Sequence, residues 1–313
     1  MEALRIGTRG STLALWQANH LRGALDHTCG VSSEVVVVMT SGDHFVGVAL
    51  EQIGIRGVFT KELEDAILDE RVDLAVHSMK DIPTDLPDVC RVAVVFPRED
   101  PRDALVSRDG KTLEELPRGA RIGTSSLRRA AQLRRFRRDF EIVELRGNVD
   151  TRLRRMESGA CDAVVLAKAG MDRLGLTSRI TEVLSADIVL PAVGQGALGV
   201  EFLERRADEF SFLDRLVDQE TMRAVKAERT LLAELEGGCR LPLGAWARFE
   251  RGRMVLDACV LPADGSECLR RRIEGACSSS DEAESLGRSL GRELLGAGAE
   301  RLLRLAGRTV GQS

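Results

Sequence analysis

The chain has 313 residues, of which 43% are hydrophobic and 30% are charged, and its formal net charge is −4. That length is too great for one ordinary compact core and predicts two or three domains. No apolar run approaches the roughly 20 residues that cross a bilayer. An acidic chain also lacks the basic surface typical of nucleic-acid binding. Neither a membrane nor a nucleic acid is therefore an expected partner.

The cysteines and histidines show no metal-ligand or disulfide pattern. Seven cysteines are spread through the chain without a Cys-x-x-Cys pair, and the four histidines lack ligand spacing. A disulfide framework and a metal site are therefore not expected. The N-terminus enters a strand pattern without the segments of an export signal, which favours a cytoplasmic protein. We expect a monomer.

The first part of the chain alternates strand and helix patterns. Residues 4–9 predict a strand, and Ser11 predicts the N-cap of a helix that ends near residue 26. Residues 34–40 predict a buried strand, and after a glycine-rich loop residues 60–69 predict a helix. Arg9 and Ser11 thus stand at a helix N-terminus, where free backbone N–H groups favour an anion.

The stretch 72–87 predicts a short apolar strand that stops in a polar, proline-bounded loop. Its end carries Ser78, Met79, Lys80 and Asp81. Ligands of open α/β sheets bind beyond the carboxyl ends of the strands, so we expect Lys80 and Asp81 to face a cleft. The alternative is a solvated surface ion pair.

The same pattern then starts again. Residues 121–124, Arg-Ile-Gly-Thr, repeat residues 5–8, and a serine-started helix, a strand, a helix near residues 151–157 and a strand at residues 161–166 follow. We interpret the repeat as two similar doubly wound α/β domains around a cleft, like those of periplasmic binding proteins. Helix starts and strand ends of both domains are expected to face that cleft.

The helix start of the second repeat combines basic and hydroxyl side chains. Arg128 and Arg129 lie in the first turn, where the helix dipole disfavours cations, so their placement costs stability unless an anion binds there. Thr124, Ser125 and Ser126 add hydroxyl donors at the same point. We predict an anion site. The alternative is a frayed helix end with both guanidinium groups in water.

Gly194, Gly196 and Gly199 have the G-x-G-x-x-G spacing of dinucleotide-binding loops. Residues 198–202 nevertheless predict a strand, whereas such a loop must open a helix, so we reject the dinucleotide interpretation. A flexible crossing that returns the chain to the first domain is expected instead.

The last part of the chain predicts a small α+β domain. Residues 219–235 predict a helix that ends at two glycines, and Cys239 follows them. Three strands, a turn and a final helix with a capping box at Ser279 and Glu282 come next. The predicted domains are residues 1–97 with 197–217, residues 98–196, and residues 218–313. Together the residues indicate a cleft that binds a ligand with several carboxylates, with one candidate covalent attachment point.

Eight ordered blocks resemble the porphobilinogen deaminase family, also called hydroxymethylbilane synthases. They cover nearly the whole chain, and they are residues 5–11, 13–18, 59–63, 76–81, 123–129, 145–149, 194–196 and 236–239. The resemblance implies a cytoplasmic transferase of tetrapyrrole and heme biosynthesis that joins four porphobilinogens head to tail into hydroxymethylbilane and releases ammonia each time. It also implies a dipyrromethane cofactor held through a thioether, which by position falls on Cys239.

The resemblance assigns roles to further residues. The cofactor would be held by Ser78, Lys80, Thr124, Ser126, Arg128 and Arg129. The substrate would be held by Arg9, Ser11, Arg146, Arg152 and Arg173. Guanidinium groups suit this task because they bind carboxylates in pairs. Asp81 would be the catalytic residue, a buried acid that stabilises positive charge as ammonia leaves and moves the associated protons.

Two other functions compete with this interpretation. Two-domain clefts also occur in non-catalytic proteins that bind carboxylate ligands, such as solute receptors. The basic helix at residues 128–138 is also compatible with a nucleic-acid binder, which would bind with steep salt dependence. A covalently attached pyrrole would exclude both alternatives.

Overall fold

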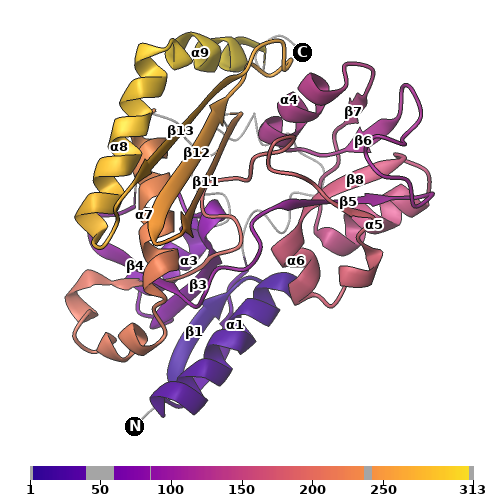
Figure 1. The fold of residues 1–313 in the computed structure, drawn as a ribbon. Coiled ribbons are helices and arrows are strands. Elements are labelled where there is room, and N and C mark those ends of the chain that lie inside the picture. Colours follow the sequence, from indigo (N-terminus) through magenta and orange to yellow (C-terminus); the bar gives the residue numbers. More distant parts are fainter. Residues whose placement is uncertain (1–2, 40–59, 85, 236–241, 310–313) are drawn as a thin grey trace. The chain divides into compact units, whose positions relative to one another are not determined.

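The computed structural model describes residues 3–39, 60–84, 86–235 and 242–309, and for residues 305–309 only the backbone (Figure 1). The chain forms two compact units, residues 1–98 with 197–222, and residues 99–196 with 223–313. The first unit contains one sheet and the second contains two. The predicted division into three domains stays a prediction, because the second and third predicted domains share one compact unit.

The first unit is built on a mixed five-stranded sheet with the order β2-β1-β3-β10-β4. Strands β1, β2 and β3 are parallel, whereas β10 runs antiparallel to both β3 and β4. The strands are β1 (Leu4–Thr8), β2 (Ser33–Val37), β3 (Leu74–Ser78), β4 (Cys90–Val95) and β10 (Leu198–Leu203). The expected return of residues 198–202 to this sheet as a strand is confirmed.

Helices cover both faces of this sheet. Helix α1 (Thr12–Ala24) continues as a π-helical turn (Leu25–Cys29) and packs Leu21 and Leu25 against Ile6 and Val76. Helix α3 (Lys61–Leu68) packs on the opposite face, because successive strand residues point to alternate sides. The prediction that β2 is buried was wrong. As an edge strand it pairs with β1 alone, and the Val37 residue is 51% exposed.

The second unit repeats this arrangement in the sheet β7-β6-β8-β5-β9. Strand β6 is parallel to β7 and β8, and β5 is antiparallel to β8, as β10 is to β3. The strands are β5 (Asp103–Ser107), β6 (Arg121–Gly123), β7 (Glu141–Val143), β8 (Ala163–Ala167) and β9 (Glu182–Val183). The two similar doubly wound α/β folds are confirmed. Strands β4, β5 and β9 were not predicted.

The helices of this second sheet also lie on both faces. Leu133 of α4 packs with Ile122 and Val165, whereas Leu153 and Met156 of α5 belong to the core on the other side. The helices are α4 (Leu127–Phe136), α5 (Val149–Glu157) and the short α6 (Lys168–Arg173), which follows β8 directly.

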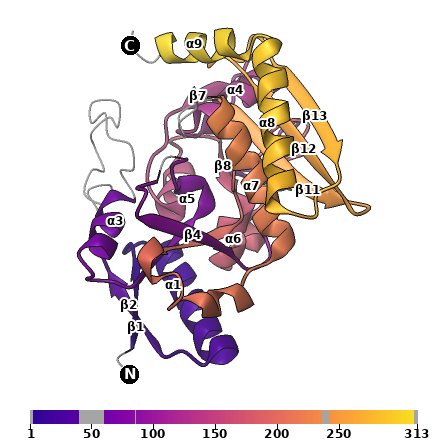
Figure 2. The ribbon, with the colours of Figure 1, turned by 90° about the vertical axis from the view of Figure 1, so that its left-hand side faces the viewer.

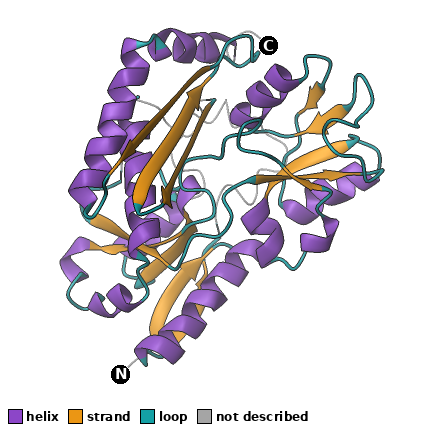
Figure 3. Ribbon diagram, viewed as in Figure 1, coloured by secondary structure: helices purple, strands orange, loops and turns teal. Residues whose placement is uncertain are grey.

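The C-terminal part of the second unit is an antiparallel three-stranded sheet with helices on one face, as Figures 2 and 3 show. Helices α7 and α8 approach closely, since a Cβ atom at Gly287 would lie 2.3 Å from the Ala227 carbonyl oxygen. Helix α9 was not predicted. The elements are α7 (Gln219–Glu234), β11 (Leu243–Glu250), β12 (Arg253–Val260), β13 (Leu269–Gly275), α8 (Ser280–Gly296) and α9 (Ala299–Thr309).

Candidate functional site

In the first unit, β3 ends in a 3₁₀ turn that carries two of the predicted site residues. The turn spans Met79–Asp81, and the Met79 N–H donates to the Ala197 carbonyl oxygen at 3.0 Å. The Ser78 hydroxyl accepts a hydrogen bond of 2.8 Å from Gln17 of α1. Lys80 is half-buried. The strand end therefore presents Lys80 and Asp81 from a turn that two neighbouring elements hold.

The expectation that Asp81 is buried was wrong, because its side chain is exposed. The short turn extends past the last strand residue, so the sheet does not cover Asp81. Met79, in contrast, is 2% exposed and anchors the turn. An acid at this position is open to a ligand on the surface of its unit.

The helix start of α1 forms as the sequence predicts. Ser11 is the N-cap, and its hydroxyl accepts a hydrogen bond from the Ala14 N–H at 3.3 Å. The side chain of Ser11 therefore already satisfies one of the free N–H groups of the first turn. Arg9 precedes this turn and is half-buried. Arg9 thus lies at a helix N-terminus whose remaining N–H groups favour negative charge.

In the second unit, Arg128 and Arg129 share one buried carboxylate. Nitrogens of Arg128 and Arg129 lie 2.8 and 2.7 Å from the two oxygens of Asp103, whose side chain is 0% exposed. Burial would raise the pKa of Asp103, but the charges of both arginines outweigh burial and hold it well below its usual range. The alternative of a frayed helix end in water is wrong, because Arg128 and Arg129 are 5% and 6% exposed.

Asp103 is the residue that the sequence analysis missed. Because two arginines in a first helical turn cost stability, the sequence predicted a bound anion there. The protein's own Asp103 carboxylate supplies part of that negative charge. Gln195 also donates to Asp103 at 2.9 Å. The signal was present in the sequence as an acid beside an apolar run at residues 104–106, but strand β5 had not been recognised.

Backbone carbonyl groups fix the orientation of both guanidinium groups. Arg128 donates to the Leu190 carbonyl oxygen at 2.6 Å, and Arg129 donates to that of Val165 at 2.9 Å. Ser126 is the N-cap of α4, and the Thr124 hydroxyl accepts from the Ser126 N–H at 3.2 Å. These hydrogen bonds orient the predicted cofactor-binding groups of this unit.

Among the described residues, Arg152 is a cation with no acidic partner. Its Nε donates to the Gly147 carbonyl oxygen at 2.8 Å, and within the described part of the chain no carboxylate forms an ion pair with it. Burial, together with the charge of Arg129, lowers the pKa of Arg152 to about 10. A negatively charged ligand near Arg152 and Arg129 would relieve this repulsion.

Arg146 and Arg173 already have acidic partners. Arg146 lies 2.6 Å from Glu144, a contact near the surface. Arg173 is buried, pairs with Glu99 at 3.0 Å and donates to the Gly196 carbonyl oxygen at 2.8 Å. Glu99 and Gly196 are the residues at which the chain enters and leaves the second α/β fold. The predicted role of Arg173 in substrate binding therefore competes with a structural role in this unit.

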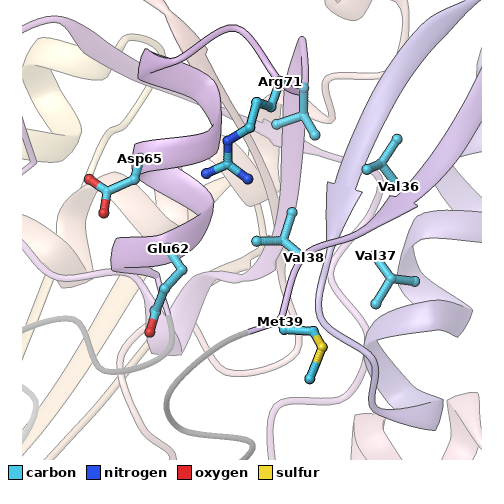
Figure 4. A pocket seen from close by; sticks show the side chains of 8 residues that line it. Val36, Val37, Val38, Met39, Glu62, Asp65 and Arg71 are labelled. Carbon is cyan, nitrogen blue, oxygen red and sulfur yellow. The ribbon is translucent and has the colours of Figure 1, made fainter.

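Cys239, predicted to attach the cofactor, lies outside the described residues. A hollow of about 440 Å³ at the end of β2 is formed by none of the predicted site residues. Figure 4 shows that its walls come from the β2 side and from α3, with Glu62, Asp65 and Arg71 around apolar side chains. Among the described residues no helix has the length and apolar character that a membrane crossing requires.

The fold and these side chains define a class before any comparison. Two α/β folds with hydroxyl groups and arginines at their helix starts form a protein suited to a small ligand with several carboxylates. Residues 4–210 match the family model described as "Porphobilinogen deaminase, dipyromethane cofactor binding domain", and residues 222–296 match "Porphobilinogen deaminase, C-terminal domain". The chain belongs to the porphobilinogen deaminase family.

Curated relatives agree with the family models. The chain is 50% identical to the porphobilinogen deaminase of Desulforudis audaxviator over 95% of this chain and 96% of that protein. It is 46% identical to that of Syntrophobacter fumaroxidans over 96% of both chains. It is 47% identical to that of Syntrophotalea carbinolica over 96% of this chain and 95% of the relative. A solved structure, the periplasmic VFT2 domain of Bordetella pertussis BvgS, gives a TM-score of 0.43 at 14% identity over 68% of this chain and 86% of that one.

Proposed function

We propose that this chain is a transferase that deaminates four porphobilinogen molecules and condenses them head to tail into hydroxymethylbilane. A dipyrromethane attached to Cys239 would serve as the primer. The observation that carries the proposal is the family match, which extends over residues 4–210 and 222–296. A solute receptor is not favoured, because the relatives that match over nearly the full chain are named as deaminases.

The residues of the second unit suit a dipyrromethane. Each pyrrole ring carries an acetate and a propionate, and these carboxylates need cationic partners with paired N–H groups. Arg152, which is expected to bind the carboxylates of the substrate pyrrole, is a half-buried cation without an acidic partner among the described residues, and Arg129 adds charge beside it. Arg128, Arg129, Thr124 and Ser126 would hold the cofactor, together with Lys80 and Ser78. The cofactor supplies a nucleophilic pyrrole carbon to which the growing chain is joined.

Asp81 would stabilise positive charge on the pyrrole and transfer protons. Its exposed carboxylate lies at the end of β3, in the turn that Ala197 and the buried Met79 hold in place. Loss of ammonia from porphobilinogen leaves positive charge on the pyrrole, which a fixed carboxylate stabilises. The same carboxylate can accept a hydrogen bond from pyrrole N–H groups and take up the proton that each condensation releases. Arg9, Ser11, Arg146, Arg152 and Arg173 would bind the substrate carboxylates.

Two variants test this proposal. Asp81→Asn keeps the shape of the side chain, so folding and the covalent pyrrole should be retained while turnover falls about 10²- to 10⁴-fold. Intact-mass measurement and Ehrlich's reagent report the pyrrole, and ammonia release reports turnover. Cys239→Ala should yield protein without a covalent pyrrole. Wild-type turnover in the first variant, or a normal adduct in the second, would contradict these assignments.

A further inference from the structure

The first unit contains a buried acid–histidine pair that has no part in the proposed chemistry. His77 of β3 and Glu201 of β10 approach to 3.0 Å, measured from Nε2 to Oε2. Their side chains are 4% and 0% exposed. Removing a carboxylate from water costs several kcal/mol unless a partner compensates, so a pair of this kind is weak as a source of stability. Buried polar pairs of this type are better known for fixing the register of neighbouring elements.

The pair links the two strands that meet at the Asp81 turn. Gly199 lies opposite His77 and Glu201 lies opposite Ala75, so the contact between Glu201 and His77 runs diagonally across the ladder. A slip of β10 by one residue would turn Glu201 to the other face of the sheet and break the pair. The pair therefore selects one register of β10 on β3.

The same register determines where the turn lies. In this register the Ala197 carbonyl oxygen accepts from the Met79 N–H at 3.0 Å. A Cβ atom at Gly199 would lie 2.4 Å from the Met79 sulfur, so Gly199 and Met79 are in direct contact. Met79 is the first residue of the turn that ends at Asp81. The position of β10 is thus transmitted to Asp81 through Met79.

We propose that Glu201 and His77 are positioning residues whose pairing fixes β10 against β3 and so holds Asp81 where it acts on substrate. The proposal rests on the proposed function, in which Asp81 is catalytic. Loss of the pair loosens the turn, so substrate still binds through the arginines while the carboxylate meets the reacting pyrrole less often. A misplacement of about 1 Å in an active site can cost on the order of a hundredfold in rate.

The test compares Glu201→Gln with Asp73→Asn. Glutamine keeps the shape of Glu201 without its charge. Asp73 lies just before β3, at the end opposite to the turn, and accepts hydrogen bonds from Arg5 and Arg206. Asp73→Asn serves as the control, because it removes an ion pair directly before the same strand. Glu201→Gln should lower kcat about 10- to 100-fold with KM nearly unchanged, and amide hydrogen exchange at residues 79–82 should accelerate.

Asp73→Asn should lower the denaturation midpoint while kcat and the exchange of residues 79–82 stay at wild-type values. The proposal is overturned if the amide hydrogens of residues 79–82 exchange at the wild-type rate in Glu201→Gln. It is also overturned if both variants lose activity only in proportion to their folded fraction. The exchange result stands whether or not Asp81 is catalytic. An active Asp81→Asn variant would refute the proposed catalytic role of Asp81 but would leave the exchange result unchanged.

A second variant serves if Glu201→Gln does not fold. Gly199→Ala places a methyl group against Met79 and should lower kcat with the same accelerated exchange. If exchange at residues 80–82 in Gly199→Ala stays at the wild-type rate, β10 does not act on the turn through Met79.

Discussion

The two α/β folds each bury one carboxylate on the corresponding strand, and they use it differently. Asp103 lies on β5 and Glu201 on β10, the strands that run antiparallel to β8 and β3. Asp103 lies opposite Ala167, the last residue of β8, whereas Glu201 lies opposite Ala75, near the start of β3. An acid at the strand end can orient the arginines of a binding site. An acid deeper in the sheet, such as Glu201, contacts the side chain of a neighbouring strand instead.

The largest expected effect comes from removing the first of these acids. Asp103→Asn leaves two buried guanidinium groups that cannot lose their protons, so the free energy of unfolding should fall by about 3–5 kcal/mol. Glu201→Gln should cost less, because it leaves one imidazole group without its partner instead of two guanidinium groups. Urea denaturation measures both variants. An equal loss of unfolding free energy in the two variants would contradict the proposed difference between Asp103 and Glu201.

Arg152 sharpens the comparison between arginines with and without an acid. Arg152→Gln removes a cation that has no acidic partner among the described residues. KM for porphobilinogen should therefore rise, or the cofactor content of the protein should fall, by about 10- to 100-fold. Arg146→Gln should change either quantity less, because Glu144 already pairs with Arg146. Steady-state kinetics and the pyrrole content of the purified protein provide the measurement. A larger effect at Arg146 would contradict this ranking.

The repeated Arg-Ile-Gly-Thr segment allows a matched pair of stability variants. A Cβ atom at Gly123 would meet side-chain atoms of Leu145 and Cys161 at 2.7 and 2.9 Å, whereas at Gly7 the nearest atom is 3.0 Å away. Gly123→Ala should therefore destabilise by about 1–3 kcal/mol, and Gly7→Ala by less. Thermal or urea unfolding measures the loss of stability in each variant. If Gly7→Ala is the more destabilising variant, the second fold tolerates overpacking better than its contacts indicate.

The sequence predicted the parts of this molecule that depend on local signals. Ser11 and Ser126 cap their helices as expected, since an N-cap is determined by a few neighbouring residues. Strands β4 and β5 were missed, because each stands close to a proline-rich charged segment that was assigned to a crossing. Asp103 was missed with β5. Its pairing with Arg128 and Arg129 is a contact across 25 or more residues, and no local pattern encodes such a contact.

The exposure of Asp81 and the burial of Arg173 were beyond the sequence for a related reason. Burial of a residue in a turn depends on how far the turn extends past the sheet, and in this chain β10 covers Met79 but not Asp81. Arg173 is the last residue of a short helix. Its partners, Glu99 and the Gly196 carbonyl oxygen, are far from it along the chain. In both cases the family motif identified the residue, whereas its surroundings depend on chain crossings that a motif does not contain.

The smallest effect concerns the acids that precede β3 and β8. Asp73 accepts from the Arg5 N–H at 2.9 Å, and Asp162 accepts from the Arg121 N–H at 2.8 Å, so the repeat extends to this contact. Burial would raise the pKa of Asp73, but hydrogen bonds from Arg5 and Arg206 outweigh it and lower the pKa to about 2. A backbone hydrogen bond from Arg121 is the main cause that lowers the pKa of Asp162.

A carboxyl group whose folded pKa is depressed stabilises the protein above its unfolded pKa of about 3.9, and this contribution is lost as the pH falls through the folded value. The stability of the wild type should therefore decline between about pH 4 and pH 2, partly through Asp73. Asp73→Asn should flatten this part of the profile more than Asp162→Asn does, because Asp73 receives hydrogen bonds from two arginine side chains. Urea unfolding at several acidic pH values measures the slopes, and equal slopes for the two variants would show that the second arginine at Asp73 adds nothing.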